Sequence, residues 1–186
     1  MPIVDANDPN VWATQWTGGY RREKFHLARK PNARILINAL NLRPGQKILL
    51  IGAGFGWTAE WLEEEGISVT ATDTSTWIQT NKGEHAKHKI LNIDVLTDPD
   101  KLKGKWTCVV SENVIPWYTI TEAKALNKAM AKLGPVAHFV TPRIVRVDGK
   151  PLKPEPEPKW SWLFIEEWRD ELPNAKIISA CTGEII

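Results

Sequence analysis

The stretch KILLIGAGFGWT, residues 47–58, constrains the fold more than any other part of this sequence. It is an unbroken run of branched apolar residues followed at once by glycines at positions 52, 54 and 56. A short run that is apolar throughout is typical of a central parallel strand, because helices cover both of its faces. The glycines let the backbone turn tightly and let a ligand approach, although a loop can also need glycine for its backbone shape alone. The N–H groups of a following helix would favour an anionic ligand group.

The rest of the chain continues this alternation of strand-like and helix-like segments. A helix is expected from Thr119, which forms a capping-box pattern with Glu122, to the residues before Gly134. Further strands are expected at 67–73, 88–95, 106–111, 136–141 and 175–180, and further helices at 31–42, 57–66, 75–88 and 160–172. The alternation predicts an α/β fold with a doubly wound, mostly parallel sheet of about six to seven strands and helices on both faces. Ligands bind at the carboxyl ends of the strands in such sheets.

The length of 186 residues fits a single domain over 1–186. Its expected parts are an N-terminal lid or helix (1–31), a ligand-binding core (32–141), an insertion loop rich in proline and lysine (142–159), and a final helix and strand (160–186). The beginning of the chain does not have the pattern of a signal peptide, and no apolar run approaches a membrane span. We therefore expect a cytoplasmic protein without a membrane partner. The two cysteines have no metal-binding spacing.

The glycine pattern distinguishes between classes of nucleotide ligand. A dinucleotide fingerprint requires GxGxxG, but here the position of the third glycine is Trp57. This pattern disfavours a nicotinamide or flavin cofactor. Asp73 ends the next predicted strand, where an acid can accept hydrogen bonds from both ribose hydroxyls of an adenosine. The alternative is that Asp73 only caps the helix that follows it.

Over residues 32–141 the sequence resembles the class I S-adenosylmethionine-dependent methyltransferases, a Rossmann-like family. Four stretches carry the resemblance, in order and at successive strand ends: RPGQKILLIGAGFG, VTATD, LNIDV and VVSENVIPW. The resemblance implies that the cofactor is S-adenosyl-L-methionine, with the glycine loop around its methionine part. It also implies that Asp73 is the ribose ligand and that Asp94 approaches the adenine amino group. The implied cofactor-binding residues are Gly52, Ala53, Gly54, Gly56, Asp73, Thr74, Ile78, Asp94, Val95 and Ser111.

The same resemblance places Glu112 and Asn113 beside the substrate, as candidate catalytic residues. Two features depart from the family pattern. The acid that commonly orients the glycine loop and the cofactor's ammonium group is replaced by Leu50, and Glu112 is a candidate for that task. Only CTGEII follows the last predicted strand, so the C-terminal hairpin is expected to be incomplete, with its seventh strand truncated or missing.

The substrate side is less clearly marked in the sequence. Trp16 and Tyr20 flank two glycines, a pattern that fits either a hinged aromatic lid or a plain turn. Residues 21–34 hold six basic residues and one acid. A nucleic-acid partner could use them, but a solvated basic helix is favoured. His138 is either a general base or a strand histidine with satisfied hydrogen bonds.

These features together predict methyl transfer from S-adenosylmethionine to a small-molecule acceptor. One alternative is different chemistry with the same cofactor, such as aminopropyl-type transfer or cleavage of the cofactor. Another is a non-catalytic module that only binds S-adenosylmethionine. The sequence carries no signal for an oligomeric state.

Overall fold

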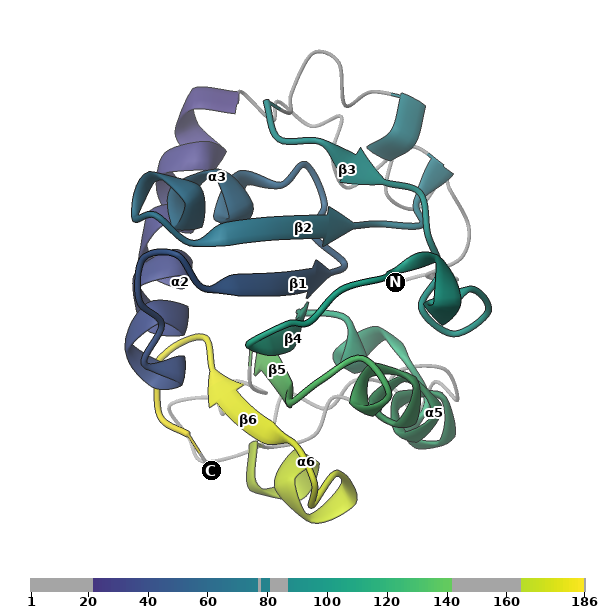
Figure 1. Ribbon diagram of the computed structural model, residues 1–186. Helices are drawn as coiled ribbons and strands as arrows, with labels where there is room; N and C mark the ends of the chain where they lie inside the picture. The colour runs from purple at the N-terminus through teal and green to yellow at the C-terminus, as the bar shows by residue number, and fades with distance from the viewer. Residues whose placement is uncertain (1–21, 77, 81–86, 142–164, 186) are drawn as a thin grey trace, which may run out of the picture.

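Six parallel strands form a sheet at the centre of the molecule (Figure 1). The computed structural model describes residues 22–76, 78–80, 87–141 and 165–185. The strands stand in the order β3-β2-β1-β4-β5-β6. Their bounds are β1 Lys47–Ile51, β2 Ser68–Thr72, β3 Ile90–Leu91, β4 Cys108–Glu112, β5 Val136–Val140 and β6 Lys176–Ser179. The order reverses between β1 and β4, so the carboxyl ends of these strands border the crevice in which such sheets bind ligands.

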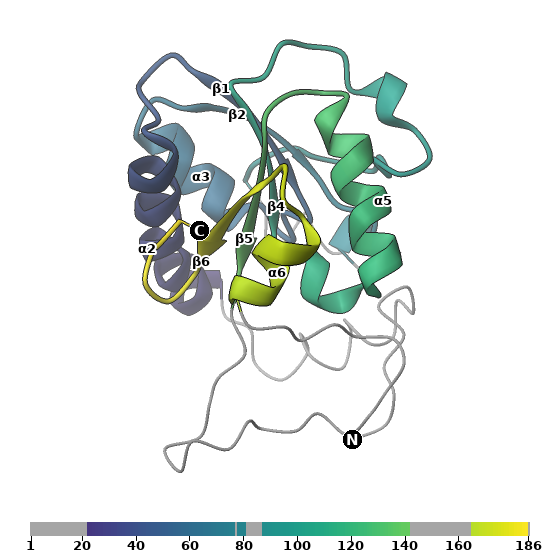
Figure 2. The same cartoon turned by 90° about the horizontal axis from the view of Figure 1, so that it is seen from below.

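Helices cover both faces of the sheet (Figure 2). On one face lie α2 (Arg22–Leu40) and α3 (Trp57–Glu64), and on the other lie α5 (Ile120–Ala131) and α6 (Ile165–Glu171). Side chains alternate along a strand, so Leu50 belongs to the apolar cluster under α2 and α3, whereas Leu49 belongs to the cluster under α5 and α6. Both leucines are fully buried, and each contributes about 1.5–3 kcal/mol to stability. The predicted α/β fold with a parallel, doubly wound sheet is confirmed.

Several element boundaries differ from those expected. The predicted strand 88–95 is a strand only over Ile90–Leu91, because the chain then turns, with the Leu96 N–H donating to Asp94 Oδ1 at 2.8 Å. The helix expected over 31–42 begins instead at Arg22, so the basic stretch is helical and Pro31 lies inside the helix. The capping box of α5 is confirmed, since the Glu122 N–H donates to Thr119 Oγ1 at 3.2 Å and the Thr119 N–H donates to Glu122 Oε2 at 2.8 Å.

The end of the chain shows how the sheet is completed. β6 pairs in parallel with β5, and Ile178 lies opposite Phe139. After β6 the described chain adds one antiparallel bridge, between Ile178 and Ile185, in place of a seventh strand. The lid residues Trp16 and Tyr20 and the insertion 142–159 lie outside the described residues. None of the described helices is long and apolar enough to cross a membrane.

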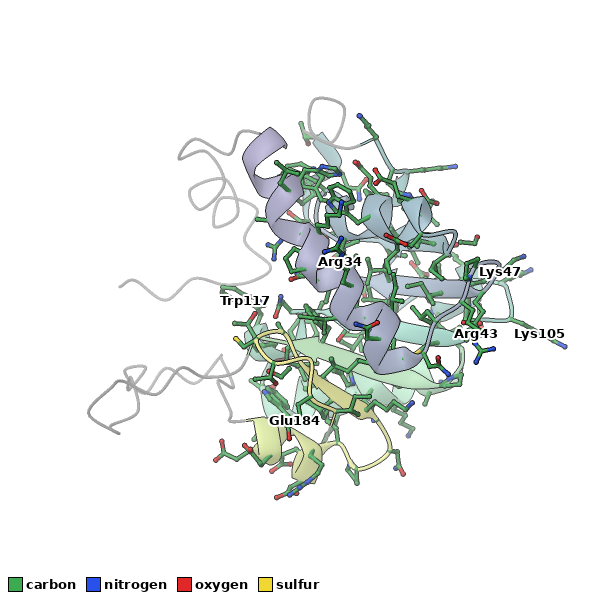
Figure 3. The ribbon with its side chains drawn as sticks, turned by 90° about the vertical axis from the view of Figure 1, so that its left-hand side faces the viewer. Arg34, Arg43, Lys47, Lys105, Trp117 and Glu184 are labelled. Atoms are coloured by element: carbon green, nitrogen blue, oxygen red, sulfur yellow. The ribbon has the colours of Figure 1, made fainter. Side chains whose placement is uncertain are left out.

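Positive charge gathers at the end of the sheet that is away from the crevice. Arg43, Lys47 and Lys105 lie close together near the amino ends of β1 and β4, as Figure 3 shows. Trp117 lies toward the opposite end of the molecule, in the short 3-10 helix η2 (Ile115–Trp117) that follows β4. These three cations therefore stand apart from the carboxyl ends of the strands.

Candidate functional site

The glycine loop between β1 and α3 needs its glycines even without a ligand. Gly52, Gly54 and Gly56 have φ angles of 69°, 56° and 73°, in the left-handed region that glycine adopts most readily. A Cβ added to Gly52 would overlap a methyl group of Val114, and a Cβ on Gly56 would lie 2.6 Å from Ile90 Cδ1. Both backbone conformation and close packing therefore require glycine in this loop.

Hydrogen bonds inside the protein use several N–H groups of this loop. The Ala53 N–H donates to the carbonyl oxygen of Thr72 at 3.0 Å, and the Gly56 N–H donates to that of Ala53 at 2.8 Å. The Gly54 N–H donates to Asp73 Oδ2 at 2.8 Å. These three N–H groups are therefore used within the protein, and those of Ala53 and Gly54 hold the loop against the end of β2.

Asp73 joins the glycine loop to the start of the next segment. Besides the bond from Gly54, its Oδ1 accepts the Ser75 N–H at 2.8 Å. Burial raises the pKa of Asp73, and the N–H groups of Ser75 and Gly54 act in the opposite direction. A carboxylate oxygen can accept about two hydrogen bonds, so each oxygen of Asp73 keeps one acceptor position for a ligand hydroxyl. Asp73 thus supports the local backbone and also borders the site.

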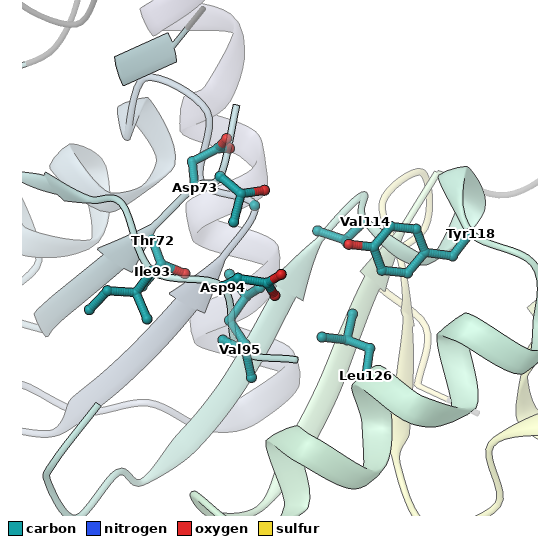
Figure 4. A pocket seen from close by; sticks show the side chains of 11 residues that line it. Thr72, Asp73, Ile93, Asp94, Val95, Val114, Tyr118 and Leu126 are labelled. Carbon is teal, nitrogen blue, oxygen red and sulfur yellow. The ribbon is translucent and has the colours of Figure 1, made fainter. Parts of the chain in front are cut away.

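A pocket opens at the carboxyl ends of the strands (Figure 4). Asp73 and Asp94 come from the ends of β2 and β3, and Tyr118 and Leu126 face them from η2 and α5. The lining residues are Ile51, Gly52, Thr72, Asp73, Thr74, Ile93, Asp94, Val95, Val114, Tyr118 and Leu126. Of the cofactor-binding residues expected from the sequence, this pocket brings together Gly52, Asp73, Thr74, Asp94 and Val95.

The other expected cofactor residues lie near the pocket without lining it. Ala53, Gly54 and Gly56 belong to the glycine loop and hold it in place. Ile78 is buried in the segment that follows Asp73. The side chain of Ser111 is fully buried and bonds within the protein, so only its backbone remains for the expected contact.

Sequence reasoning missed several residues of the pocket, above all Thr72 and Tyr118. Thr72 is 1% exposed, and its Oγ1 has no hydrogen-bond partner in the described structure. Burial raises the pKa of Tyr118 to about 12, and the nearby carboxylates of Asp94, Glu122 and Asp73 raise it as well. The phenol therefore stays protonated at neutral pH and can donate a hydrogen bond. Tyr118 directly follows the VVSENVIPW stretch, which could have signalled it.

The two candidate catalytic residues have defined partners. Glu112 ends β4, and its Oε1 accepts hydrogen bonds from Thr58 Oγ1 at 2.6 Å and from Asn32 Nδ2 at 3.2 Å. Asn113 has a φ of 54°, a conformation that asparagine tolerates, and its Oδ1 accepts the Thr141 N–H at 2.7 Å. The side-chain oxygen of Asn113 is thus already used in holding the ends of β4 and β5 together.

A second polar cluster lies inside the sheet, next to Glu112 along β4. Ser111 Oγ lies 2.7 Å from His138 Nδ1, and His138 Nε2 lies 3.2 Å from Asn127 Oδ1 on α5. His138 is fully buried, and burial lowers its pKa to about 3, so the imidazole is neutral at physiological pH. As a neutral ring, it donates from Nε2 to Asn127 and accepts from Ser111. The interpretation of His138 as a strand histidine with satisfied hydrogen bonds is confirmed.

Part of the basic stretch packs against α3. Lys30 Nζ lies 4.2 Å from the centre of the Trp61 ring, and the His26 ring stacks on the same tryptophan at 4.6 Å. Trp61 Nε1 donates to the carbonyl oxygen of His26 at 2.7 Å.

The part of the chain that the structure describes contains no group of three or more His, Cys, Asp or Glu side chains placed to hold a metal ion.

Comparison with known proteins gives matches at the level of structure. No family model and no curated protein matches the sequence. Magnesium protoporphyrin IX methyltransferase (ChlM) from Synechocystis PCC 6803, solved with bound S-adenosylhomocysteine, is similar with a TM-score of 0.59 and 17% identity over 94% of this chain and 87% of that chain. A chain from the Haloferax volcanii complex of the Trm112 methyltransferase activator with a protein described as a methyltransferase is similar with a TM-score of 0.62 and 15% identity, over 93% and 78%.

This chain has the fold of the class I S-adenosylmethionine-dependent methyltransferases.

A third similar structure, from Rhodobacter sphaeroides, is described as a Zn-dependent alcohol dehydrogenase. It has a TM-score of 0.53 and 25% identity over 72% of this chain. The chain spans only 55% of that dehydrogenase-type chain, or about half its length. The methyltransferase fold is thus shared over most of the chain, whereas the dehydrogenase likeness is partial.

Proposed function

We propose that this protein binds S-adenosylmethionine in the pocket described above and transfers its methyl group to a small-molecule acceptor. The observation that carries the proposal is Asp73, whose carboxylate is fixed by the Gly54 and Ser75 N–H groups and borders the pocket. A fixed acid at the end of β2 suits the two adjacent hydroxyls of a ribose. S-adenosylhomocysteine bound to the similar Synechocystis enzyme supports the same cofactor class.

The remaining lining residues fit the adenine part of such a cofactor. Ile93 and Val95 on one side and Val114 and Leu126 on the other offer apolar surface for a flat ring. Asp94 supplies a carboxylate that can accept a hydrogen bond from an amino group. A slot with apolar walls and a few polar groups at its edge is the usual form of a site for a heteroaromatic base.

The cofactor supplies a methyl group that its sulfonium sulfur already activates. The protein's part would then be mainly to hold donor and acceptor in line and to keep water out, since positioning alone can supply a large part of the acceleration. In the proposed arrangement Asp73 fixes the ribose, and the glycine loop and β4 position the amino-acid part. The acceptor would approach from the side of β4 and η2.

A nicotinamide cofactor is the competing hypothesis that an observation favours. The strand order of this sheet also occurs in dinucleotide-binding domains, and the partial likeness to a dehydrogenase-type chain points the same way. Trp57 argues against it, because this buried residue, 3% exposed, stands where the fingerprint needs its third glycine for close packing of helix and strand. The two hypotheses predict different ligands.

Calorimetric titration of the protein with S-adenosylhomocysteine, S-adenosylmethionine and NAD tests the proposal. We expect micromolar binding of the two sulfur compounds and none of NAD. Asp73→Asn should weaken S-adenosylhomocysteine by at least about tenfold, because hydrogen bonds to a charged group are worth about 1.5–3 kcal/mol. Asp100→Asn, at an exposed acid, is the matched control and should bind like the wild type.

Different results would replace the proposal by a specific alternative. Binding of NAD alone would contradict it and favour the dinucleotide hypothesis. Equal affinities of the wild type and Asp73→Asn would remove Asp73 from the site. With binding established, incubation of S-adenosylmethionine with a panel of small-molecule acceptors separates methyl transfer from cofactor cleavage, aminopropyl-type transfer and binding without turnover, because the products differ.

A further inference from the structure

A buried hydroxyl in the wall of the pocket has no hydrogen-bond partner within the described part of the protein. Thr72 lines the pocket and is 1% exposed, and no described group bonds to its Oγ1. The other buried side-chain atoms without a hydrogen-bond partner among the described residues belong to His26, Trp106 and Trp168, and none of these three residues lines the pocket. A polar group that is buried without a partner costs free energy. The fold alone therefore does not account for the hydroxyl of Thr72.

Packing does not require this hydroxyl. In the register of the sheet, Thr72 stands beside Ile51 on β1 and Leu91 on β3. Ile51 belongs to the apolar cluster under α5 and α6, and Leu91 packs against that cluster, so Thr72 is a polar residue between two apolar ones. Valine has a similar branched shape, suits a strand equally well and would fill the position without a polar atom. What threonine adds here is a group that can donate and accept hydrogen bonds.

The backbone on both sides of the Thr72 side chain is fixed by hydrogen bonds. The carbonyl oxygen of Thr72 accepts the Ala53 N–H at 3.0 Å, and the Asp73 N–H donates to the carbonyl oxygen of Leu91 at 3.1 Å. Because threonine is branched at Cβ, its χ1 angle is also restricted. The hydroxyl is thus held in a defined place before a ligand binds, and a preorganised group loses little conformational freedom on binding.

Thr72 lies in the part of the pocket where the proposed ligand would place its base. The same wall carries Asp73, to which we assign the ribose, and Ile93, which offers apolar surface to the ring (Figure 4). Asp94 is placed to accept from the amino group of the base. That amino group is the donor of an adenine, and the other polar atoms on its edges are ring nitrogens that accept. A hydroxyl beside the ring can meet such a nitrogen by donating to it.

We propose that the Thr72 hydroxyl donates a hydrogen bond to a ring nitrogen of the ligand's adenine base. This inference rests on the proposed function, and it makes Thr72 a residue that determines which base the pocket accepts. The bond satisfies the buried oxygen only when the ligand is present, so the hydroxyl favours the complex and disfavours the free protein. A ring that carries C–H in place of that nitrogen is rejected, because the buried hydroxyl is then left without a partner.

The test compares ligands that differ in one ring atom. S-adenosylhomocysteine and its 1-deaza, 3-deaza and 7-deaza analogues, each with one ring nitrogen replaced by C–H, are titrated into the wild type and into Thr72→Val by calorimetry. Thr72→Val should weaken S-adenosylhomocysteine by about three- to tenfold, the range of a neutral hydrogen bond. One of the deaza analogues should bind Thr72→Val at least as tightly as it binds the wild type, whereas the other two should be weakened like S-adenosylhomocysteine. The melting temperature of ligand-free Thr72→Val should not fall below that of the wild type, which separates lost binding from lost folding.

Thr70→Val makes the same chemical change two residues earlier on the same face of β2, at a residue outside the pocket lining, and should leave all four affinities unchanged. Thr72→Ser keeps the hydroxyl and should keep the wild-type ranking of the analogues. Equal weakening of all four ligands by Thr72→Val, or unchanged affinities, would overturn the assignment of Thr72 while leaving the proposed function standing. Failure of the folded wild type to bind S-adenosylhomocysteine would overturn the proposed function and this inference with it.

Discussion

Ser111 and Glu112 are neighbours on β4, both buried and both polar, and yet their surroundings differ. Ser111 points to the face covered by α5 and is closed into a chain with His138 and Asn127. Glu112 points to the face covered by α2 and α3, where two donors among the described residues, Thr58 and Asn32, both bond to its Oε1.

The difference shows that burial of polar groups does not by itself indicate a functional site. In the Ser111 cluster each acceptor has a donor, so the protein alone accounts for it. In the Glu112 cluster the donors among the described residues, Thr58 and Asn32, both bond to Oε1. We therefore assign the Ser111 cluster to stability, and we expect the hydrogen bond from Thr58 to Glu112 to contribute to stability as well.

The largest effect is expected from breaking the Ser111 cluster. His138→Leu has a similar volume but leaves the buried Ser111 hydroxyl and the Asn127 amide without their partner. Because an unmade buried hydrogen bond costs about 1–3 kcal/mol, we expect the free energy of unfolding to fall by about 3 kcal/mol in urea titrations. The affinity for S-adenosylhomocysteine should stay unchanged. A variant as stable as the wild type would show that the cluster contributes little.

The same histidine should make stability depend on pH. The pKa of His138 is about 3 in the folded protein and about 6.5 when exposed, so between these values the unfolded chain binds more protons than the folded one. The free energy of unfolding should therefore fall as the pH falls through this window, by about 2 kcal/mol between pH 7.5 and 5. The raised pKa of Asp73 acts in the opposite direction. The difference between urea titrations of the wild type and of His138→Leu isolates the histidine, and a difference that does not change with pH would contradict a neutral buried ring.

A smaller effect, with opposite signs, is expected at two threonines. Thr58 and Thr72 are 2% and 1% exposed, but among the described residues a hydrogen-bond partner is found for the Thr58 hydroxyl alone, the Glu112 carboxylate. Thr58→Val should lower the free energy of unfolding by about 2 kcal/mol, because it removes a hydrogen bond to a charged group. Thr72→Val should raise the free energy of unfolding by up to about 1 kcal/mol, because it removes a buried hydroxyl to which no described residue bonds. Thermal and urea unfolding of the two variants side by side checks this, and changes of the same sign would contradict the distinction.

The sequence predicted the sheet, the glycine loop and the acids at the strand ends, because each of these leaves a local pattern. Continuous apolar runs mark parallel strands, as at 47–51, and Asp73 directly follows a strand pattern in which apolar and small polar residues alternate. The partner of Glu112 could not be predicted, because Asn32 comes from a helix 80 residues earlier in the chain and only the fold brings the two together. Tyr118 and Leu126 face the pocket for the same reason, since their positions depend on how η2 and α5 pack.

Boundaries were predicted less well than the elements themselves. The apolar residues of 88–95 suggested a full strand, but Asp94 bonds to the N–H of Leu96 and turns the chain after two strand residues. The helix expected from residue 31 begins at Arg22 and joins the basic stretch to it, with Pro31 inside the helix.

The most direct measurement is a crystal structure of the protein grown with S-adenosylhomocysteine. We expect the ribose hydroxyls to bond to Asp73 and the adenine to lie beside Asp94 and Val95. A ligand in the pocket whose ribose lies away from Asp73 would contradict the role given to that residue, and a ligand elsewhere on the protein would contradict the proposed site itself.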